Sequence, residues 1–298
     1  MTILNFPTAA VDFGLEASEA VFPVTTRDLQ IVGKLPGCTL PVASHKAVIR
    51  TDKDGSNPRG IGIVGKDFKV LKNKDYFGAV EKSLMSTMDR TLMRNMQINT
   101  ETSYDGAWCQ REYIFPEYAA ELTTSSDFKT NIGFRIIAWN AYDGSSSAGC
   151  VSGLVDFFCT NGIVMGSLVD ISKRRHTSGL MADHFDHQIK FGVERVQEEI
   201  TMLRKLATTE LDWAAADTLL KKSFSETRAE KLLERTKLEA RARGNNVFAL
   251  HSALTYYASH DSAEFGVRNT GADNVGKTLH NRQAEVAKLM PAVHRLAA

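Results

Sequence analysis

Hydrophobic and polar positions alternate along the first half of the chain in runs that predict β-strands. Two apolar runs, 45–50 and 60–71, flank the polar stretch 52–58, whose Asp, Gly, Asn and Pro residues favour a tight turn, so we expect a hairpin. The pattern continues in further runs, separated by polar turns, at 96–103, 107–115, 131–140 and 148–158. These paired runs predict a meandering antiparallel sheet.

The spacing of apolar residues changes to a helical period at several places. Asn73 is a candidate N-cap for a helix that runs to about Asp89. After residue 185, apolar side chains fall on one helical stripe at Val193, Val196, Ile200 and Leu203. Ser225 and Asn246 can cap two later helices, so the last third of the chain is expected to be mainly helical.

The pattern as a whole predicts an α+β fold. An N-terminal antiparallel β-meander with one helix is followed by a mainly helical C-terminal region. We expect an N-terminal arm over 1–40, a sheet region over 41–175 and a helical region over 176–298 that packs on the sheet. The three parts can also form a single domain, because 298 residues are within the range of one large domain.

Charge divides unevenly along the chain. The 36 Lys and Arg residues nearly balance 35 Asp and Glu, which excludes binding to nucleic acid through overall charge. Residues 1–170 have a net charge of −3, however, and residues 171–298 have a net charge of +4. A local basic face therefore remains compatible with the composition.

The N-terminus and the cysteines indicate a cytoplasmic protein. Acidic residues interrupt the first 23 positions, where no basic stretch precedes an apolar run, so we expect no signal peptide. No window approaches 18 uncharged apolar residues, so no membrane span is expected. The four cysteines are far apart and form no C-x-x-C pair, which favours buried thiols in a reducing compartment: Cys38, Cys109, Cys150 and Cys159.

Two glycine-rich segments match nucleotide-binding spacings. Gly271 to Thr278 fits G-x-x-x-x-G-K-[ST], but the preceding residues make a poor core strand and only 20 residues follow. We expect a polar loop followed by a helix. Gly60 to Gly65 fits G-x-G-x-x-G but lies inside an apolar run, which is more typical of a twisted strand. We therefore expect no nucleotide cofactor.

A histidine pair resembles half of a metal site. His184 and His187 can share one helix face and bind zinc, but H-E-x-x-H is absent and no third ligand is evident. A helix start rich in Asp and His is the favoured interpretation, and no metal is expected. No Ser-His-Asp signature is present either, so the sequence favours a protein without enzymatic activity.

Basic residues are concentrated in two segments. The densest run, at the predicted strand-to-helix junction, comprises Lys173, Arg174, Arg175 and His176. Lys66 and Lys69 follow the predicted hairpin and are interleaved with Phe68. Such cations can hold phosphates, and aromatic rings between them can stack on bases. The alternative is a solvated junction whose aromatic residues belong to the core.

Four segments together resemble a phage- and plasmid-borne family of unknown function. They are 62–77, Cys159-Thr-Asn-Gly162, Arg174-Arg-His-Thr177 and 246–257, with Arg268 beyond the last, and the likeness covers roughly residues 40–280. Phe68 stands where that family usually has Tyr. The resemblance implies a mobile-element origin and a location in the cytoplasm of a host cell, but no activity.

The predicted order of elements is also similar to that of the single-strand annealing recombinases of the Rad and RecT kinds. Those proteins form rings or filaments and hold DNA in a basic groove without nucleotide hydrolysis. The similarity implies a homo-oligomer and a DNA partner.

Three hypotheses follow. The first is a phage or plasmid protein that binds and anneals single-stranded DNA, with phosphate contacts from Lys173, Arg174, Arg175, His176, Arg135, Lys66 and Lys69. The second is a non-enzymatic interaction factor that targets a host or viral protein. The third, which the sequence favours least, is an enzyme: an NTPase through Lys277, or a metal hydrolase through His184 and His187.

Overall fold

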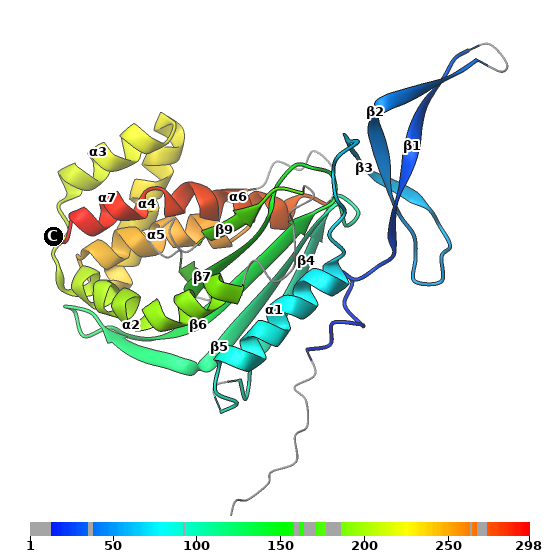
Figure 1. Ribbon diagram of the computed structural model, residues 1–298. Helices are drawn as coiled ribbons and strands as arrows, with labels where there is room; N and C mark the ends of the chain where they lie inside the picture. Colours follow the sequence, from blue (N-terminus) through cyan, green and yellow to red (C-terminus); the bar gives the residue numbers. More distant parts are fainter. Residues whose placement is uncertain are drawn as a thin grey trace, which may run out of the picture.

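The computed structural model describes residues 13–34, 38–91, 93–157, 161–163, 171–176, 186–262, 264–266 and 273–298. The first sheet has three strands. Figure 1 shows that it projects from a larger body, in which a second sheet is flanked by helices. The predicted α+β class is confirmed: a β-meander comes first, a second sheet follows, and the C-terminal region is mostly helical.

The projecting sheet is formed by β1 (Val24–Val32), β2 (Thr39–Arg50) and β3 (Arg59–Gly65), antiparallel and in that order. The β2–β3 pair contains the predicted hairpin, whereas β1 was not predicted and lies inside the expected N-terminal arm. Strand β3 ends well before residue 71. The Phe68 N–H bonds to the Gly65 carbonyl at 3.0 Å, which turns the chain out of the strand.

The first helix, α1 (Asn73–Thr87), follows this turn and ends close to the predicted residue. The N-cap prediction was wrong. Lys72 occupies the cap position, and the buried Asn73 side chain instead donates to the Ala20 carbonyl at 2.8 Å. The Asn140 amide also donates to the Asn73 side-chain oxygen, at 2.7 Å. Asn73 therefore joins the N-terminal segment to the second sheet.

The second sheet has the strand order β4-β5-β6-β7-β8, with β9 also paired to β7. All its described pairings are antiparallel, as predicted. Its strands are β4 (Gln97–Ser103), β5 (Trp108–Thr123), β6 (Lys129–Ala141), β7 (Ala148–Asp156), β8 (Asn161–Ile163) and β9 (Ile171–Arg174).

Alternation along β5 and β6 separates two faces of this sheet. One face carries Tyr113 and Phe134 into the main core against α1 and α2 (Asp186–Thr208). The opposite face carries Trp108 and Trp139, which contact His280 of α6 (Val275–Ala287) at ring centroid distances of 5.5 and 4.4 Å. Both faces are thus covered at this point.

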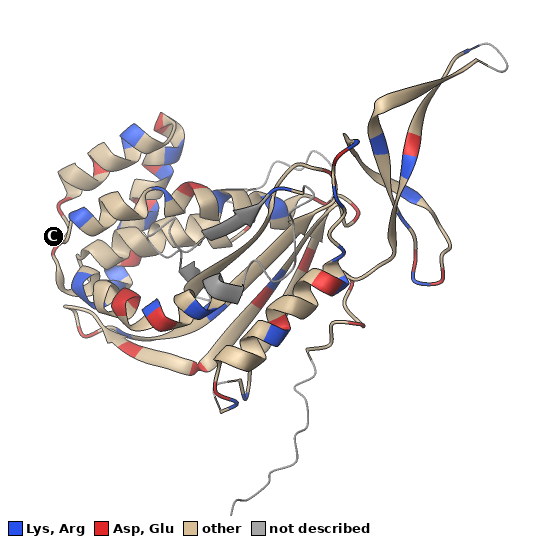
Figure 2. Ribbon diagram, in the orientation of Figure 1, with Lys and Arg blue, Asp and Glu red and all other residues tan. Residues whose placement is uncertain are grey.

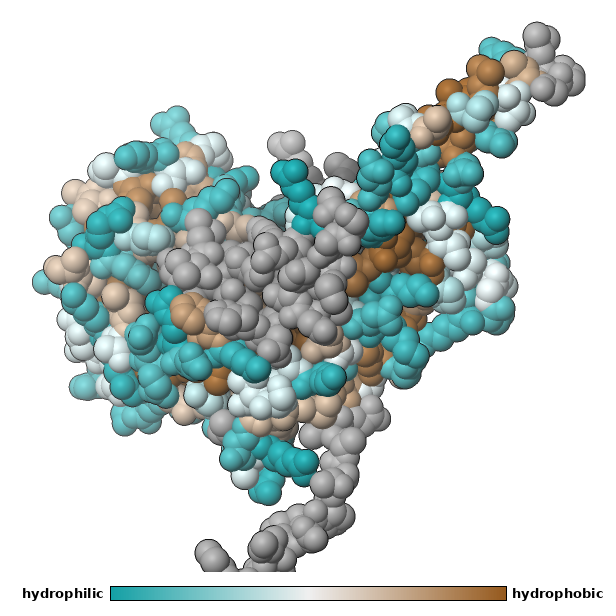
Figure 3. All heavy atoms as spheres, in the orientation of Figure 1, coloured by the Kyte–Doolittle hydropathy of each residue, from teal (hydrophilic) through white to brown (hydrophobic). Residues whose placement is uncertain are grey.

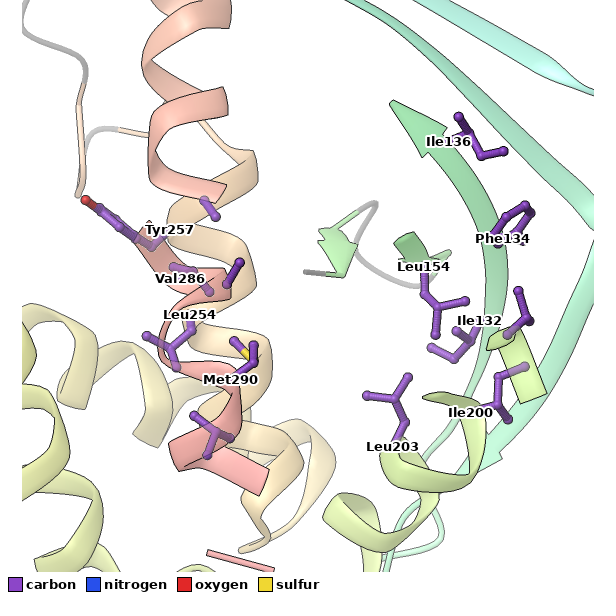
Figure 4. Close-up of a cluster of buried hydrophobic side chains, with 14 of the residues drawn as sticks. Ile132, Phe134, Ile136, Leu154, Ile200, Leu203, Leu254, Tyr257, Val286 and Met290 are labelled. Atoms are coloured by element: carbon purple, nitrogen blue, oxygen red, sulfur yellow. The ribbon is translucent and has the colours of Figure 1, made fainter. Parts of the chain in front are cut away.

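The main core joins the sheet to the helices. Figure 4 shows side chains of β6, β7 and α2 facing side chains of the C-terminal helices, and its labelled members are Ile132, Phe134, Ile136, Leu154, Ile200, Leu203, Leu254, Tyr257, Val286 and Met290. The close approach of α2 to β7 depends on Gly192. A Cβ there would lie 1.6 Å from the Ser152 hydroxyl oxygen.

The remaining helices are α3 (Trp213–Ser223), α4 (Glu226–Arg243), α5 (Val247–Ser259) and α7 (Met290–Arg295). Asn246 caps α5 as predicted, since its side chain accepts from the Ala249 N–H at 3.1 Å. Ser225 stands at the N-cap of α4 without a side-chain cap bond. In the described ranges, no helix is long and apolar enough to cross a bilayer.

Two buried ion pairs fix helices to the second sheet. Glu81 of α1 lies 3.1 Å from the Arg111 guanidinium on β5, and Arg243 of α4 lies 2.8 Å from the Asp156 carboxylate on β7. Because removal of either partner leaves a buried charge, such pairs strongly favour this arrangement of helices once the sheet has formed.

Candidate nucleic-acid interface

Two of the predicted basic segments meet beside the projecting sheet. The Lys69 N–H donates to the His176 carbonyl at 2.9 Å, and the His176 Nδ1 lies 3.1 Å from the Lys69 carbonyl oxygen. The loop after β3 and the residues after β9 are therefore tied together although they are far apart in the sequence. We call Lys66, Lys69 and Arg175 the basic junction.

Two aromatic rings support this contact from inside. The His176 imidazole stacks on the Phe68 ring with centroids 4.5 Å apart and planes at 13°. His176 is buried and Phe68 is half-buried. Burial lowers the pKa of His176, although its hydrogen bond to Lys69 and the Asp143 charge oppose this. His176 thus holds the junction together through its ring and its backbone, and its predicted contact with phosphate stays a prediction.

The basic junction presents its charges to solvent. Lys66, Lys69 and Arg175 are exposed and make no ion pair within the part of the chain that the structure describes. Lys66 lines an open depression of about 460 Å³, together with Ala43, Ser44, Gly65, Asp67, Phe68 and His176. Asp67 is the one acidic residue of this lining. Lys66 and Asp67 offset each other in this lining, so the excess positive charge comes from Lys69 and Arg175 beside it.

Strand β2 contributes a cation that the sequence analysis did not assign. The Lys46 ammonium donates to the Phe68 carbonyl at 2.6 Å, and the Lys66 N–H donates to the Ser44 carbonyl at 3.0 Å. Lys46 lies within the predicted hairpin, so pairing of its strand with 60–65 was the signal that could have placed it near Lys66.

Strand β9 carries the first two cations of the predicted basic run. Lys173 and Arg174 are paired with Gly149 and Ala148 of β7, so their backbone is adjacent to the basic junction. Their side chains lie outside the described part of the structure.

Arg135 does not join this group. It is buried on β6, and its guanidinium donates to the Glu112 carboxylate at 2.5 Å. The two groups belong to a separate cavity between β4–β6 and α6. The predicted phosphate contact at Arg135 is therefore replaced by an internal ion pair.

The G-x-x-x-x-G-K-[ST] match also has a structural role in its described part. Helix α6 begins at Val275, in agreement with the expected loop and helix, while Gly271 lies outside the described residues. The Lys277 ammonium bonds to the Ser145 hydroxyl and lies 3.9 Å from the Asp143 carboxylate. Its charge is thus used to attach α6 to the β6–β7 turn.

The structure describes the G-x-G-x-x-G match in full and the histidine pair only in part. Gly60–Gly65 lies within β3, which confirms the strand interpretation over a dinucleotide turn. A Cβ at Gly62 would lie 2.6 Å from the Asp143 Cα, so this glycine allows the two sheets to approach. His184 lies outside the described residues, as does the side chain of His187, which belongs to α2.

Comparison with known proteins identifies one match. The family model described as "Domain of unknown function (DUF932)" matches residues 61–290, which is most of the chain. No curated protein and no solved structure matches.

Proposed function

The chain belongs to the DUF932 family, and we propose that this member is a phage or plasmid protein that binds and anneals single-stranded DNA, in recombination or replication and without nucleotide hydrolysis. The proposed contacts are the basic junction together with Lys46, Lys173 and Arg174. The family model carries no activity, so the proposal depends on the chemistry of this surface.

One observation carries the proposal. Two hydrogen bonds between Lys69 and His176, one between backbone groups and one from the His176 ring to the Lys69 carbonyl, bring cations from two distant segments onto one face. These cations have no acidic partner in the described structure. Surface cations are usually balanced locally. Figure 2 shows Lys and Arg interleaved with Asp and Glu over the helices. A group of unbalanced cations is suited to a phosphate backbone.

The ring of Phe68 favours the binding of single-stranded DNA over duplex DNA. Its half-buried ring is fixed on one side by His176 and lines the open depression beside Lys66. Single-strand binding proteins combine a basic track with aromatic rings on which unpaired bases stack, and this stacking tolerates any sequence. Paired bases inside a duplex do not offer their faces in this way.

The net charge of the chain determines how tightly we expect it to bind DNA. With a net charge of +1, the chain has no long-range field that attracts DNA, so affinity must come from the local cations. We expect moderate binding that weakens steeply with salt, and annealing activity that needs several copies of the chain.

The test is a fluorescence anisotropy titration of a labelled dT30 oligonucleotide across a range of salt concentrations. In K66A/K69A, we expect the slope of log K against log salt to fall by about 1.4, because each lost phosphate contact on a single strand contributes about 0.7. The matched control is K221A/K237A, which removes two exposed lysines of α3 and α4 that are paired with acidic residues.

Several results would count against the proposal. The first is the absence of binding to dT30 at low salt. The second is an equal fall of the salt slope in K66A/K69A and K221A/K237A. The third is tighter binding to a duplex of the same length than to the single strand. Annealing is measured separately, as the rate at which two complementary labelled strands pair without nucleotide.

The projecting sheet favours the second candidate, a function through protein contacts. Ile31, Val32 and Leu40 near its tip are 60, 79 and 60% exposed, and Ile31 lies directly opposite Leu40 on the paired strand. Figure 3 shows hydrophobic atoms along this projection. Exposed apolar side chains on a strand pair are typical of a docking surface.

For this second candidate the occupant we propose is another copy of the chain. Light scattering should then give a mass above 32.9 kDa for the wild type, and I31D/L40D should shift it toward the monomer. A monomer at all concentrations would exclude the second copy.

A further inference from the structure

A polar cavity on the α6 side of the second sheet is not explained by DNA binding. It has a volume of about 200 Å³ and lies between β4, β5 and β6 and helix α6. Its lining is mainly polar: Gln97, Asn99, Glu101, Gln110, Glu112, Ile114, Arg135, Val155, Phe157, Ser259, Leu279, His280 and Gln283. Internal packing does not require so many polar groups in one place.

Two hydrogen-bond acceptors in this cavity have no protein donor in the described structure. Gln110 is 6% exposed, and its side-chain oxygen makes no hydrogen bond. Glu101 lies directly opposite Gln110 on the paired strand, at the exposed rim of the cavity, and no hydrogen bond or ion pair within the described structure engages its carboxylate. A buried amide oxygen without a donor is costly, so a ligand that supplies N–H groups would stabilise it.

The remaining charged groups are already paired. The Arg135 guanidinium donates to one oxygen of Glu112, and the Asn99 amide donates to the other at 3.2 Å. One guanidinium and two carboxylates leave the cavity with an excess of negative charge. Loss of hydration, and next the Glu112 charge, raise the pKa of Glu101, and the nearby Arg135 charge opposes this only in part.

We propose that this cavity binds a small organic cation, an alkylguanidinium or alkylammonium group that donates hydrogen bonds to Glu101 and Gln110. The apolar side chains of Ile114, Val155 and Phe157, which line the same cavity, suit the alkyl stem. A metal ion fits poorly, because no group of three potential His, Cys, Asp or Glu ligands occurs among the described residues.

Helix α6 fixes the position of Glu101. A Cβ at Gly276, in the first turn of α6, would lie 2.7 Å from a Glu101 carboxylate oxygen. Helix and carboxylate are therefore in close contact, which limits the positions that the carboxylate can take on the α6 side. A preformed site of this size selects a small group rather than a large molecule.

The probe is n-butylguanidinium, titrated into the full-length protein by calorimetry, with n-butylurea as its neutral isostere. E101Q keeps the shape of the side chain and removes its charge. We expect at least about tenfold weaker binding of n-butylguanidinium to E101Q, the effect of losing one charge-assisted hydrogen bond. The control E121Q removes an exposed carboxylate of β5 that lies outside the cavity lining, and it should bind as the wild type does.

The source of the cation is decided by a second titration with blocked Gly-Arg-Gly peptide. Binding of either probe supports the proposed site if E101Q weakens it. A free small amine is the natural ligand if only n-butylguanidinium binds, and an arginine of another protein is the ligand if the peptide binds as well. Equal binding of n-butylurea, an unchanged E101Q, or no saturable binding by either cation would overturn the proposal. Circular dichroism of E101Q confirms that the variant is folded.

Discussion

The imidazole of His176 lies nearly parallel to the ring of Phe68, 4.5 Å away between centroids. This stack, with the two hydrogen bonds between His176 and Lys69, attaches the end of β9 to the loop that leaves the projecting sheet. The basic junction therefore depends on an uncharged aromatic contact beneath it.

This contact should make stability depend on pH. Burial lowers the pKa of His176 below 6.5, so the unfolded chain binds more protons than the folded chain at mildly acidic pH. The contribution of the neutral ring is complete above pH 6.5 and is lost as the pH falls from there toward the lower folded pKa. Urea unfolding of H176F should show a smaller loss of stability between pH 7.5 and 5.5 than the wild type.

The control for this prediction is H45Q, which changes an exposed histidine of β2. It should keep the wild-type pH dependence. An H176F profile equal to that of the wild type would mean that His176 does not titrate in this way. Burial also lowers the pKa of His294, so some pH dependence should remain in H176F.

Loss of the buried pair of Arg243 and Asp156 should destabilise the fold more than loss of the exposed pair of Lys237 and Glu234, which is also on α4. R243M removes a fully buried guanidinium that pairs with both Asp156 and Glu239, and it leaves two buried carboxylates without this cation, which should lower the free energy of unfolding by about 3–5 kcal/mol in urea titrations. K237M removes an exposed lysine paired with Glu234, and it should cost less than about 1 kcal/mol. Equal losses would contradict the assigned role of burial.

Lys277 should matter for attachment of α6 and not for nucleotide. K277A removes its contacts with Ser145, Asp143 and the Tyr104 ring, 5.3 Å away, so hydrogen exchange in α6 should become faster. Neither wild type nor K277A should retain radiolabelled ATP on a filter. Retention that K277A abolishes would restore the P-loop interpretation.

Cysteine reactivity should follow burial. Burial raises the pKa of both Cys109 and Cys150 to about 12, so their thiols remain protonated and shielded, whereas Cys38 is exposed. Alkylation with iodoacetamide, read peptide by peptide in a mass spectrometer, should modify Cys38 in the native protein. Cys109 and Cys150 should react only in urea, and native labelling of either one would be inconsistent with the core as described.

Much of the fold could be predicted from periodicity. Alternating runs located β3 to β7, and Asn246 marked the start of α5. Strand β1 was missed because Arg27 and Asp28 stand at its centre and nearly all of its residues are exposed, so it has no hydrophobic alternation. It is a strand because β2 offers an edge, which is a tertiary effect.

The cysteines were expected to be buried thiols. Among those with described side chains, Cys109 and Cys150 are buried and Cys38 is exposed.

The basic junction could be predicted only in part. Lys66, Lys69 and Arg175 were identified as cations, but their proximity depends on the hydrogen bonds between Lys69 and His176, which are far apart in the sequence. Arg135 was misplaced because β6 is covered on both faces, so the sequence does not show which side chains meet solvent. The pair of Glu101 and Gln110 was missed because the sequence does not show that Gln110 is buried while Glu101, opposite it on β4, stays exposed.

The tip of the projecting sheet lies outside the core of the fold. The family match begins at residue 61, inside β3, so β1 and β2 lie outside it although they form one sheet with a matched strand. Substitutions near the tip, at Ile31, Val32 and Leu40, change no core contact, because these side chains are largely exposed. The tip can therefore be replaced or shortened without repacking the body, so whatever it contacts is specified independently of the fold that carries it.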